Sequence, residues 1–122
     1  MGELIFVVDD NDVNLAVAAS ALDADYTVLT MSSAQKMFEL LGKKRPALIF
    51  LDIEMPQMGG FEAMARLKEK PEWKDIPVVF VTGWIDEKIN ADFRQSGALD
   101  IIQKPIKPPL FLEYAKKYLS RD

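Results

Sequence analysis

The sequence predicts an α/β fold in which a parallel sheet of five strands is covered by helices on both faces. Short apolar segments alternate along the chain with longer segments that have helical spacing. The apolar segments are unbroken, which is typical of strands buried on both faces. Glycine, proline and capping residues separate the segments, so five strand–helix units fit into 122 residues.

In the first half of the chain we expect a strand, a helix, a strand, a helix and a strand. They should cover Leu4–Val8, Asn11–Leu22, Tyr26–Thr30, a segment from Ser32 or Ser33 to about Gly42, and Ala47–Leu51. A serine hydroxyl can cap the second helix, and Gly42 is a stop signal. The first helix is expected to bury one side that carries Val13, Ala16, Val17 and Ala21.

In the second half the same alternation continues after Gly59-Gly60, which breaks the chain before a helix that carries Phe61, Met64 and Leu67. We then expect a strand, a helix, a strand and a helix, over Ile76–Val81, Asp86–Gly97, Leu99–Ile102 and Leu110–Leu119. The pair Pro108-Pro109 suits the start of the last helix.

The composition is that of one soluble domain and argues against several functions. Apolar residues make up 49% and charged residues 28%, so we expect residues 1–122 to form a single domain without an output domain. The apolar segments are too short to cross a bilayer, and we expect a cytoplasmic protein with no membrane insertion. A net charge of −4 without a basic stripe argues against direct binding of nucleic acid.

Polar side chains stand at the ends of the predicted strands, where parallel sheets form their sites. They are Asp9 and Asp10 after the first strand, Asp52 after the third, Thr82 after the fourth and Lys104 after the fifth. With a flavodoxin-like strand order of 2-1-3-4-5, these residues converge on one edge. Three carboxylates there raise each other's pKa values, and a hard divalent cation relieves the repulsion.

The residue types restrict the chemistry of such a site. The chain has no histidine and no cysteine, and oxygen ligands alone select Mg²⁺, Mn²⁺ or Ca²⁺ rather than zinc. A carboxylate such as that of Asp52 is a competent nucleophile toward phosphorus. The Lys104 ammonium and the Thr82 hydroxyl can then stabilise the phosphoryl oxygens.

These motifs resemble those of the receiver domains of two-component response regulators, and the resemblance covers nearly the whole chain. The matching segments are Val7–Asn11, Leu51–Phe61, Val81–Gly83, Gly97-Ala98 and Lys104-Pro105. The resemblance implies a flavodoxin-like (βα)5 fold with strand order 2-1-3-4-5.

The resemblance also implies roles for individual residues. Asp52 accepts a phosphoryl group from a histidine kinase or phosphotransfer protein, and Thr82 and Lys104 contact the phosphoryl oxygens. Mg²⁺ is bound by Asp10, Asp52 and the backbone carbonyl of Glu54, with Asp9 acting mainly through water. The Lys104–Pro105 peptide bond is expected to be cis.

For the domain as a whole, the resemblance implies a signalling switch rather than an enzyme with an external substrate. The domain promotes its own phosphorylation and dephosphorylation. The change on phosphorylation alters binding to a downstream protein, or formation of a homodimer, through the last two helices and the last strand.

Three positions depart from common family patterns and are candidates for modulating the switch. Ile101 stands where receivers usually carry an aromatic residue that moves together with the threonine, so that coupling is open to question here. Trp84 either covers the phosphoryl group against water or packs as a partly exposed aromatic. Glu54 either tunes metal affinity or hydrolysis, or contributes only its backbone.

Other interpretations remain open at this point. Asp9 and Asp10 are also suitable N-caps for the following helix. An aspartate-nucleophile phosphohydrolase would carry Asp-x-Asp where this chain has Asp52-Ile53-Glu54, and a flavodoxin-like FMN carrier would need a hydroxyl-rich loop after the first strand. A receiver-like module that only binds partners is the fourth alternative.

Overall fold

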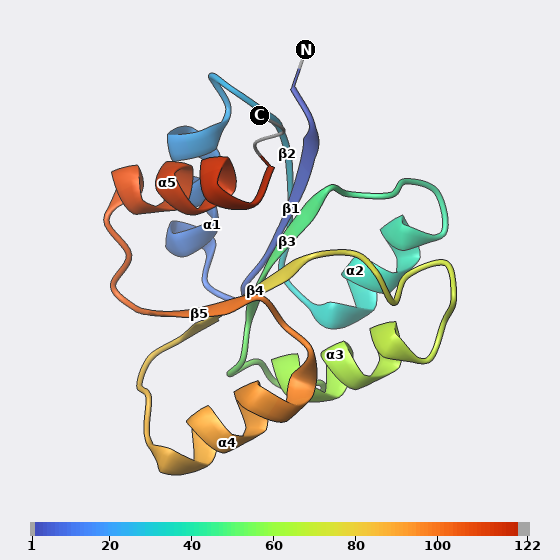
Figure 1. The fold of residues 1–122 in the computed structure, drawn as a ribbon. Helices are drawn as coiled ribbons and strands as arrows, with labels where there is room; N and C mark the ends of the chain where they lie inside the picture. The colour runs from blue at the N-terminus through green and yellow to red at the C-terminus, as the bar shows by residue number, and fades with distance from the viewer. Residues whose placement is uncertain (1, 120–122) are drawn as a thin grey trace.

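The five strands form one parallel sheet in the order β2-β1-β3-β4-β5 (Figure 1), which confirms the predicted order. The computed structural model describes residues 2–119. The strands are β1 (Leu4–Val8), β2 (Thr27–Met31), β3 (Leu48–Asp52), β4 (Val78–Thr82) and β5 (Asp100–Gln103). β1 and β3 are neighbours at the centre of the sheet, and β4 lies between β3 and β5.

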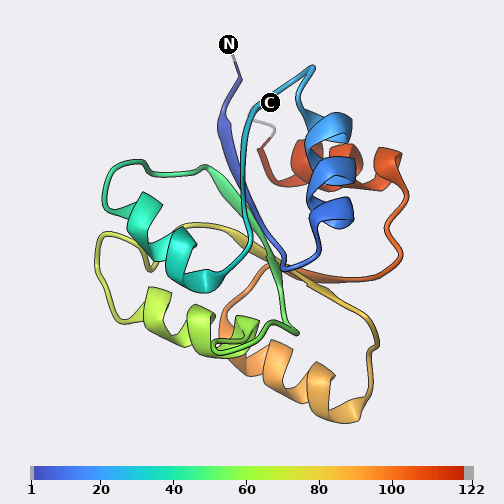
Figure 2. The same ribbon diagram turned by 180° about the vertical axis from the view of Figure 1, so that it is seen from behind.

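Five helices cover the two faces of the sheet. They are α1 (Asp12–Leu22), α2 (Ala34–Leu41), α3 (Gly60–Lys68), α4 (Glu87–Ser96) and α5 (Pro108–Leu119). α1 and α5 lie together on one face, and α2, α3 and α4 lie on the other (Figures 1 and 2). Across residues 2–119, no helix combines the length and the apolar character needed to cross a membrane.

Capping side chains fix where three of the helices begin. Asn11, Ser33 and Asp86 each accept a hydrogen bond from the backbone N–H three residues further on. α4 ends at Gly97, whose φ of 87° lies in the left-handed region that glycine adopts without strain.

The central strands end one residue later than the sequence predicts. β3 begins at Leu48 and ends at Asp52, and β4 begins at Val78 and ends at Thr82. Asp52 and Thr82 therefore belong to the hydrogen-bonded ladder, in which Asp52 pairs with Val81 and Thr82 with Gln103. All five residues of β3 and all five of β4 are buried, so both polar side chains extend directly from the core.

The sheet separates two apolar cores, one beneath each layer of helices. The expected buried side of α1 was correct only in part: Val17 and Ala21 pack against the core, but Val13 is 69% exposed and Ala16 is exposed. The fully buried residues of this helix are Leu15, Ala18 and Leu22. α2, α3 and α5 also contribute fully buried residues, but α4 has none. α4 is therefore attached to the sheet only through half-buried side chains such as Ile89 and Phe93.

Candidate functional site

Three aspartates meet at the carboxyl end of the two central strands. Each of Asp9, Asp10 and Asp52 offers a carboxylate oxygen, and these oxygens lie within 4.8 Å of one another. Asp9 and Asp52 are buried, with relative exposures of 5% and 1%, whereas Asp10 is exposed at the mouth of the cluster. The strand order brings them together, because β1 and β3 are hydrogen-bonded neighbours.

Lys104 supplies a positive charge to this cluster from the far side of β4. Its Nζ lies 3.2 Å from Asp9 Oδ2 and 3.2 Å from Asp52 Oδ2. Its backbone N–H donates to the carbonyl of Thr82 at 2.7 Å, and the Lys104–Pro105 peptide bond is cis. The lysine is thus held at the end of β5 with its side chain directed toward both buried carboxylates.

Backbone and amide donors orient the two buried aspartates. The Asn11 N–H donates to Asp9 Oδ1 at 2.9 Å, and Asn14 Nδ2 donates to Asp9 Oδ2 at 3.3 Å. The N–H of Glu54 donates to Asp52 Oδ1 at 3.2 Å. Asn11 is the N-cap of α1, so neither Asp9 nor Asp10 has that role. The contribution of Asn14 was missed at the sequence level, because an asparagine in a first helical turn is no distinctive signal.

The loop after β3 is packed tightly against Asp52. The Gly60 N–H donates to the carbonyl of Ile53 at 2.9 Å. A Cβ atom on Gly60 would lie only 2.6 Å from the carbonyl oxygen of Asp52. Because no real Cβ tolerates such a contact with backbone, glycine at this position lets α3 begin directly against the end of β3.

Burial and neighbouring charge set the protonation behaviour of the site. Burial and the nearby charge of Asp9 raise the pKa of Asp52 from 3.8 to about 7, although Lys104 and the Glu54 N–H offset part of the rise. Burial lowers the pKa of Lys104, but the charges of Asp52 and Asp9 outweigh it and hold that pKa above its ordinary value. The lysine therefore stays charged while Asp52 is poised to titrate near neutrality.

The donor set suits a hard divalent cation. The clustered ligand atoms are all carboxylate oxygens, and the chain has neither cysteine nor histidine. Such oxygens favour Mg²⁺ or Ca²⁺ over softer metals. A cation at the exposed Asp10 side of the cluster would also relieve the repulsion that raises the pKa of Asp52.

The three modulating candidates, Glu54, Trp84 and Ile101, lie around Thr82 at the end of β4 and on β5. Thr82 is fully buried, and its hydroxyl has two acceptors within reach: Glu54 Oε2 at 2.5 Å and the carbonyl of Trp84 at 3.0 Å. The Trp84 side chain is 56% exposed. Ile101 is half-buried, pairs with Phe80 across the β4–β5 ladder and packs against the core beneath α2, α3 and α4.

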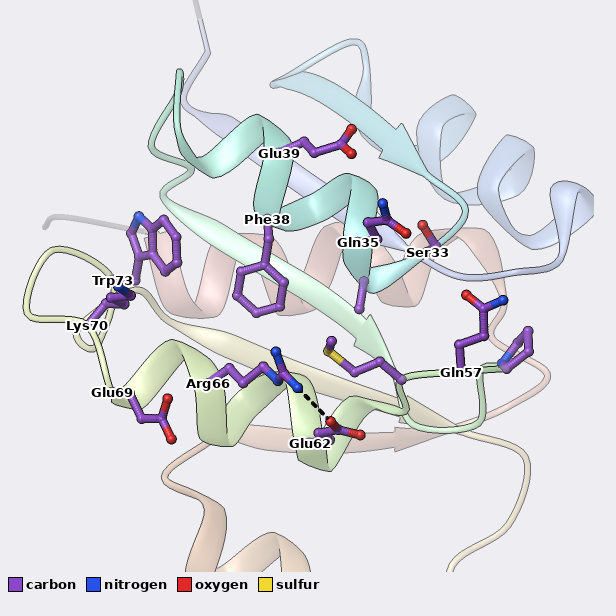
Figure 3. A pocket seen from close by; sticks show the side chains of 13 residues that line it. Ser33, Gln35, Phe38, Glu39, Gln57, Glu62, Arg66, Glu69, Lys70 and Trp73 are labelled. Carbon is purple, nitrogen blue, oxygen red and sulfur yellow. Dashed lines mark hydrogen bonds and ion pairs between the residues drawn. The ribbon is translucent and has the colours of Figure 1, made fainter.

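A large hollow is separate from the acid cluster. It measures about 760 Å³ and lies between α2, α3 and the loop after β3 (Figure 3). The rings of Phe38 and Trp73 line it with their centroids 5.6 Å apart and their planes tilted by 41°. Glu62 pairs with Arg66 at 3.1 Å along α3. None of the cluster aspartates lines it.

Comparison with known proteins agrees with this arrangement. Residues 5–116 match the response regulator receiver domain. The polar-differentiation response regulator DivK of Brucella anthropi is 32% identical over 121 residues, covering 98% of each chain.

Solved structures show the same architecture. The chemotaxis response regulator CheY4 of Vibrio cholerae superposes with a TM-score of 0.89 at 24% identity, over 98% of this chain and 100% of that one. The BeF3-activated receiver domain of DrrB superposes with a TM-score of 0.86 at 27% identity, over 99% and 100%. The chain therefore belongs to the response regulator receiver domain family of two-component signalling.

Proposed function

We propose that this chain is a phosphorelay receiver in which Asp52 accepts a phosphoryl group. The observation that carries the proposal is that four charged residues at the carboxyl ends of β1, β3 and β5 converge on one sheet edge: Asp9, Asp10, Asp52 and Lys104. Asp52 is the nucleophile of choice because it ends β3, between β1 and β4, and its carboxylate bonds to Lys104.

The chemistry follows from the groups around Asp52. A carboxylate oxygen attacks the phosphorus of a phosphohistidine, a P–O bond forms as the P–N bond breaks, and the imidazole leaves with a proton from solvent. Lys104 neutralises negative charge on the phosphoryl oxygens, and the Thr82 hydroxyl donates a hydrogen bond to one of them. Later attack by water releases inorganic phosphate and restores the carboxylate.

We further propose that the site works with a divalent cation, Mg²⁺ first and Mn²⁺ or Ca²⁺ as substitutes. Asp10, Asp52 and the backbone carbonyl of Glu54 would hold it directly, and Asp9 would act mainly through water. When bound, the cation supplies positive charge against the phosphoryl oxygens. Because these roles belong to one site, removing a single ligand should affect cation binding and phosphorylation together.

The proposed signalling role follows from the same site. A histidine kinase or phosphotransfer protein, in the cytoplasm, donates the phosphoryl group, and phosphorylation shifts a two-state equilibrium that involves Thr82, Trp84 and Ile101. The output is a change in binding to a downstream protein, or in homodimerisation, through α4, β5 and α5. No external substrate is turned over.

The test uses a small phosphodonor. The protein is incubated with acetyl phosphate and Mg²⁺, and its intact mass is measured with and without Asp52→Asn. The matched control is Asp12→Asn, which removes an exposed acid of α1 outside the cluster. We expect wild type and the control to gain one phosphoryl group and Asp52→Asn to gain none. A wild type that gains nothing would instead indicate a module that only binds partners.

A further inference from the structure

The Glu54 side chain occupies a pair of hydrogen-bond donors at the end of β4. Its Oε2 accepts a hydrogen bond from the Thr82 hydroxyl at 2.5 Å, and its Oε1 accepts one from the N–H of Gly83 at 3.0 Å. Glu54 follows Asp52 by two residues, and its own N–H donates to the Asp52 carboxylate. The side chain thus reaches from the end of β3 to the end of β4.

The two donors are arranged for an anion. Thr82 is fully buried and fixed as the last residue of β4, and its hydroxyl has a single proton to donate. Gly83 is exposed, and apart from its chain neighbours a Cβ atom on it would meet only Glu54 Oε1, at 3.8 Å. The space in front of its N–H is therefore open once the glutamate leaves. Hydrogen bonds from such donors to a charged oxygen are stronger than those to a neutral one.

A phosphoryl group on Asp52 would need the same donors. Asp52 pairs with Val81 in the β3–β4 ladder, which places its carboxylate at the same sheet edge as Thr82. The Thr82 proton cannot be donated to Glu54 and to a phosphoryl oxygen at once. The two anions would also repel each other if they shared the site.

We propose that Glu54 is a built-in competitor of the phosphoryl group. Its carboxylate holds the donors of Thr82 and Gly83 in the unphosphorylated protein and must leave before a phosphoryl oxygen can take its place. This rests on the proposed phosphorylation of Asp52. Displacing Glu54 subtracts from the binding free energy of the incoming anion, so the residue holds the switch in its resting state.

The test measures binding of beryllium fluoride, a phosphoryl mimic, in the presence of Mg²⁺ by titration of wild type, Glu54→Ala and Glu39→Ala. Glu39 is an exposed acid of α2, so its variant carries the same change in net charge. We expect Glu54→Ala to bind beryllium fluoride about tenfold more tightly than wild type and Glu39→Ala do. Glu54→Gln presents an amide N–H₂ to one of the donors, so its affinity should lie between those of wild type and Glu54→Ala.

A structural readout accompanies the titration. The amide resonance of Gly83 should shift on Glu54→Ala in the unliganded protein, and the shifts of wild type and variant should converge at saturation. Equal affinities for wild type and Glu54→Ala would overturn the competition while leaving the phosphoacceptor role in place. If neither protein binds the mimic or gains a phosphoryl group, the proposed function fails and the competition fails with it.

Discussion

Lys104 follows β5 and Asp52 ends β3, two strands that are not neighbours in the sheet, yet the Lys104 ammonium bonds to the Asp52 carboxylate at 3.2 Å. β4 separates their strands, so the lysine reaches past the end of β4 to make this contact. Asp9, which follows β1, bonds to the same ammonium at 3.2 Å. One cation therefore ties together three strands and two buried negative charges.

The raised pKa of Asp52 makes stability depend on pH. Asp52 titrates near pH 7 in the folded chain and near 3.8 when unperturbed, so between these values the folded state holds a proton that the unfolded state has lost. The free energy of unfolding should therefore decrease as pH rises from about 4 to about 7 and level off above.

Without metal, Asp52→Asn should be more stable than wild type by about 2 to 4 kcal/mol at pH 8, with the difference disappearing toward pH 4. Urea denaturation across this pH range measures it. Asp12→Asn should follow the wild-type curve. If the free energies of unfolding of wild type and Asp52→Asn changed with pH in parallel, the pKa of Asp52 would not be raised in the folded protein.

Magnesium should stabilise the folded protein at neutral pH, because it binds the folded cluster and not the unfolded chain. At a concentration of about ten times Kd, the gain is about 1.4 kcal/mol, or about 5 °C in Tm. Asp10→Asn should lose most of this gain, and because Asp10 is exposed the substitution leaves the core intact. Thermal unfolding with and without Mg²⁺ measures the effect; an unchanged gain in Asp10→Asn would remove this residue from the cation site.

Gly60→Ala should destabilise the protein by about 2 kcal/mol, because the new methyl group would press on the backbone of Asp52 and Ile53. Gly42→Ala is the matched control: its Cβ would meet Glu39 O at 3.4 Å, and its φ of −70° suits alanine. Chemical denaturation compares the two. If both substitutions are neutral, the contact between α3 and the end of β3 is looser than the structure indicates.

Trp84→Ala should shorten the lifetime of phosphorylated Asp52 severalfold if the indole shields the phosphoryl group from water. Stability should change by less than about 0.5 kcal/mol, because the side chain is exposed. Trp84→Phe should give an intermediate lifetime, since part of the ring surface remains. The loss of the phosphoryl mass with time measures all three proteins, and identical lifetimes would leave Trp84 with a backbone role alone.

The sequence was sufficient to predict the fold and the residues that meet in the acid cluster. Unbroken apolar strands such as β3 predict burial on both faces, and residues at strand ends meet wherever parallel strands are neighbours. The buried face of α1 could be predicted only in part, because alanine, valine and leucine lie on several sides of this helix. The direction of the Glu54 side chain was equally inaccessible, since it depends on donors 28 and 29 residues further along the chain.

The absence of a buried residue in α4 has a consequence for how the domain moves. A helix that inserts no side chain fully into the core has a low free energy of local opening, and its amide hydrogens should exchange with solvent before those of the other described helices. α4 follows Thr82 by only a few residues, whereas every residue of β4, the strand that ends at Thr82, is buried. If Asp52 is phosphorylated as we propose, the change at the end of β4 would reach the surface most easily through this weakly anchored helix.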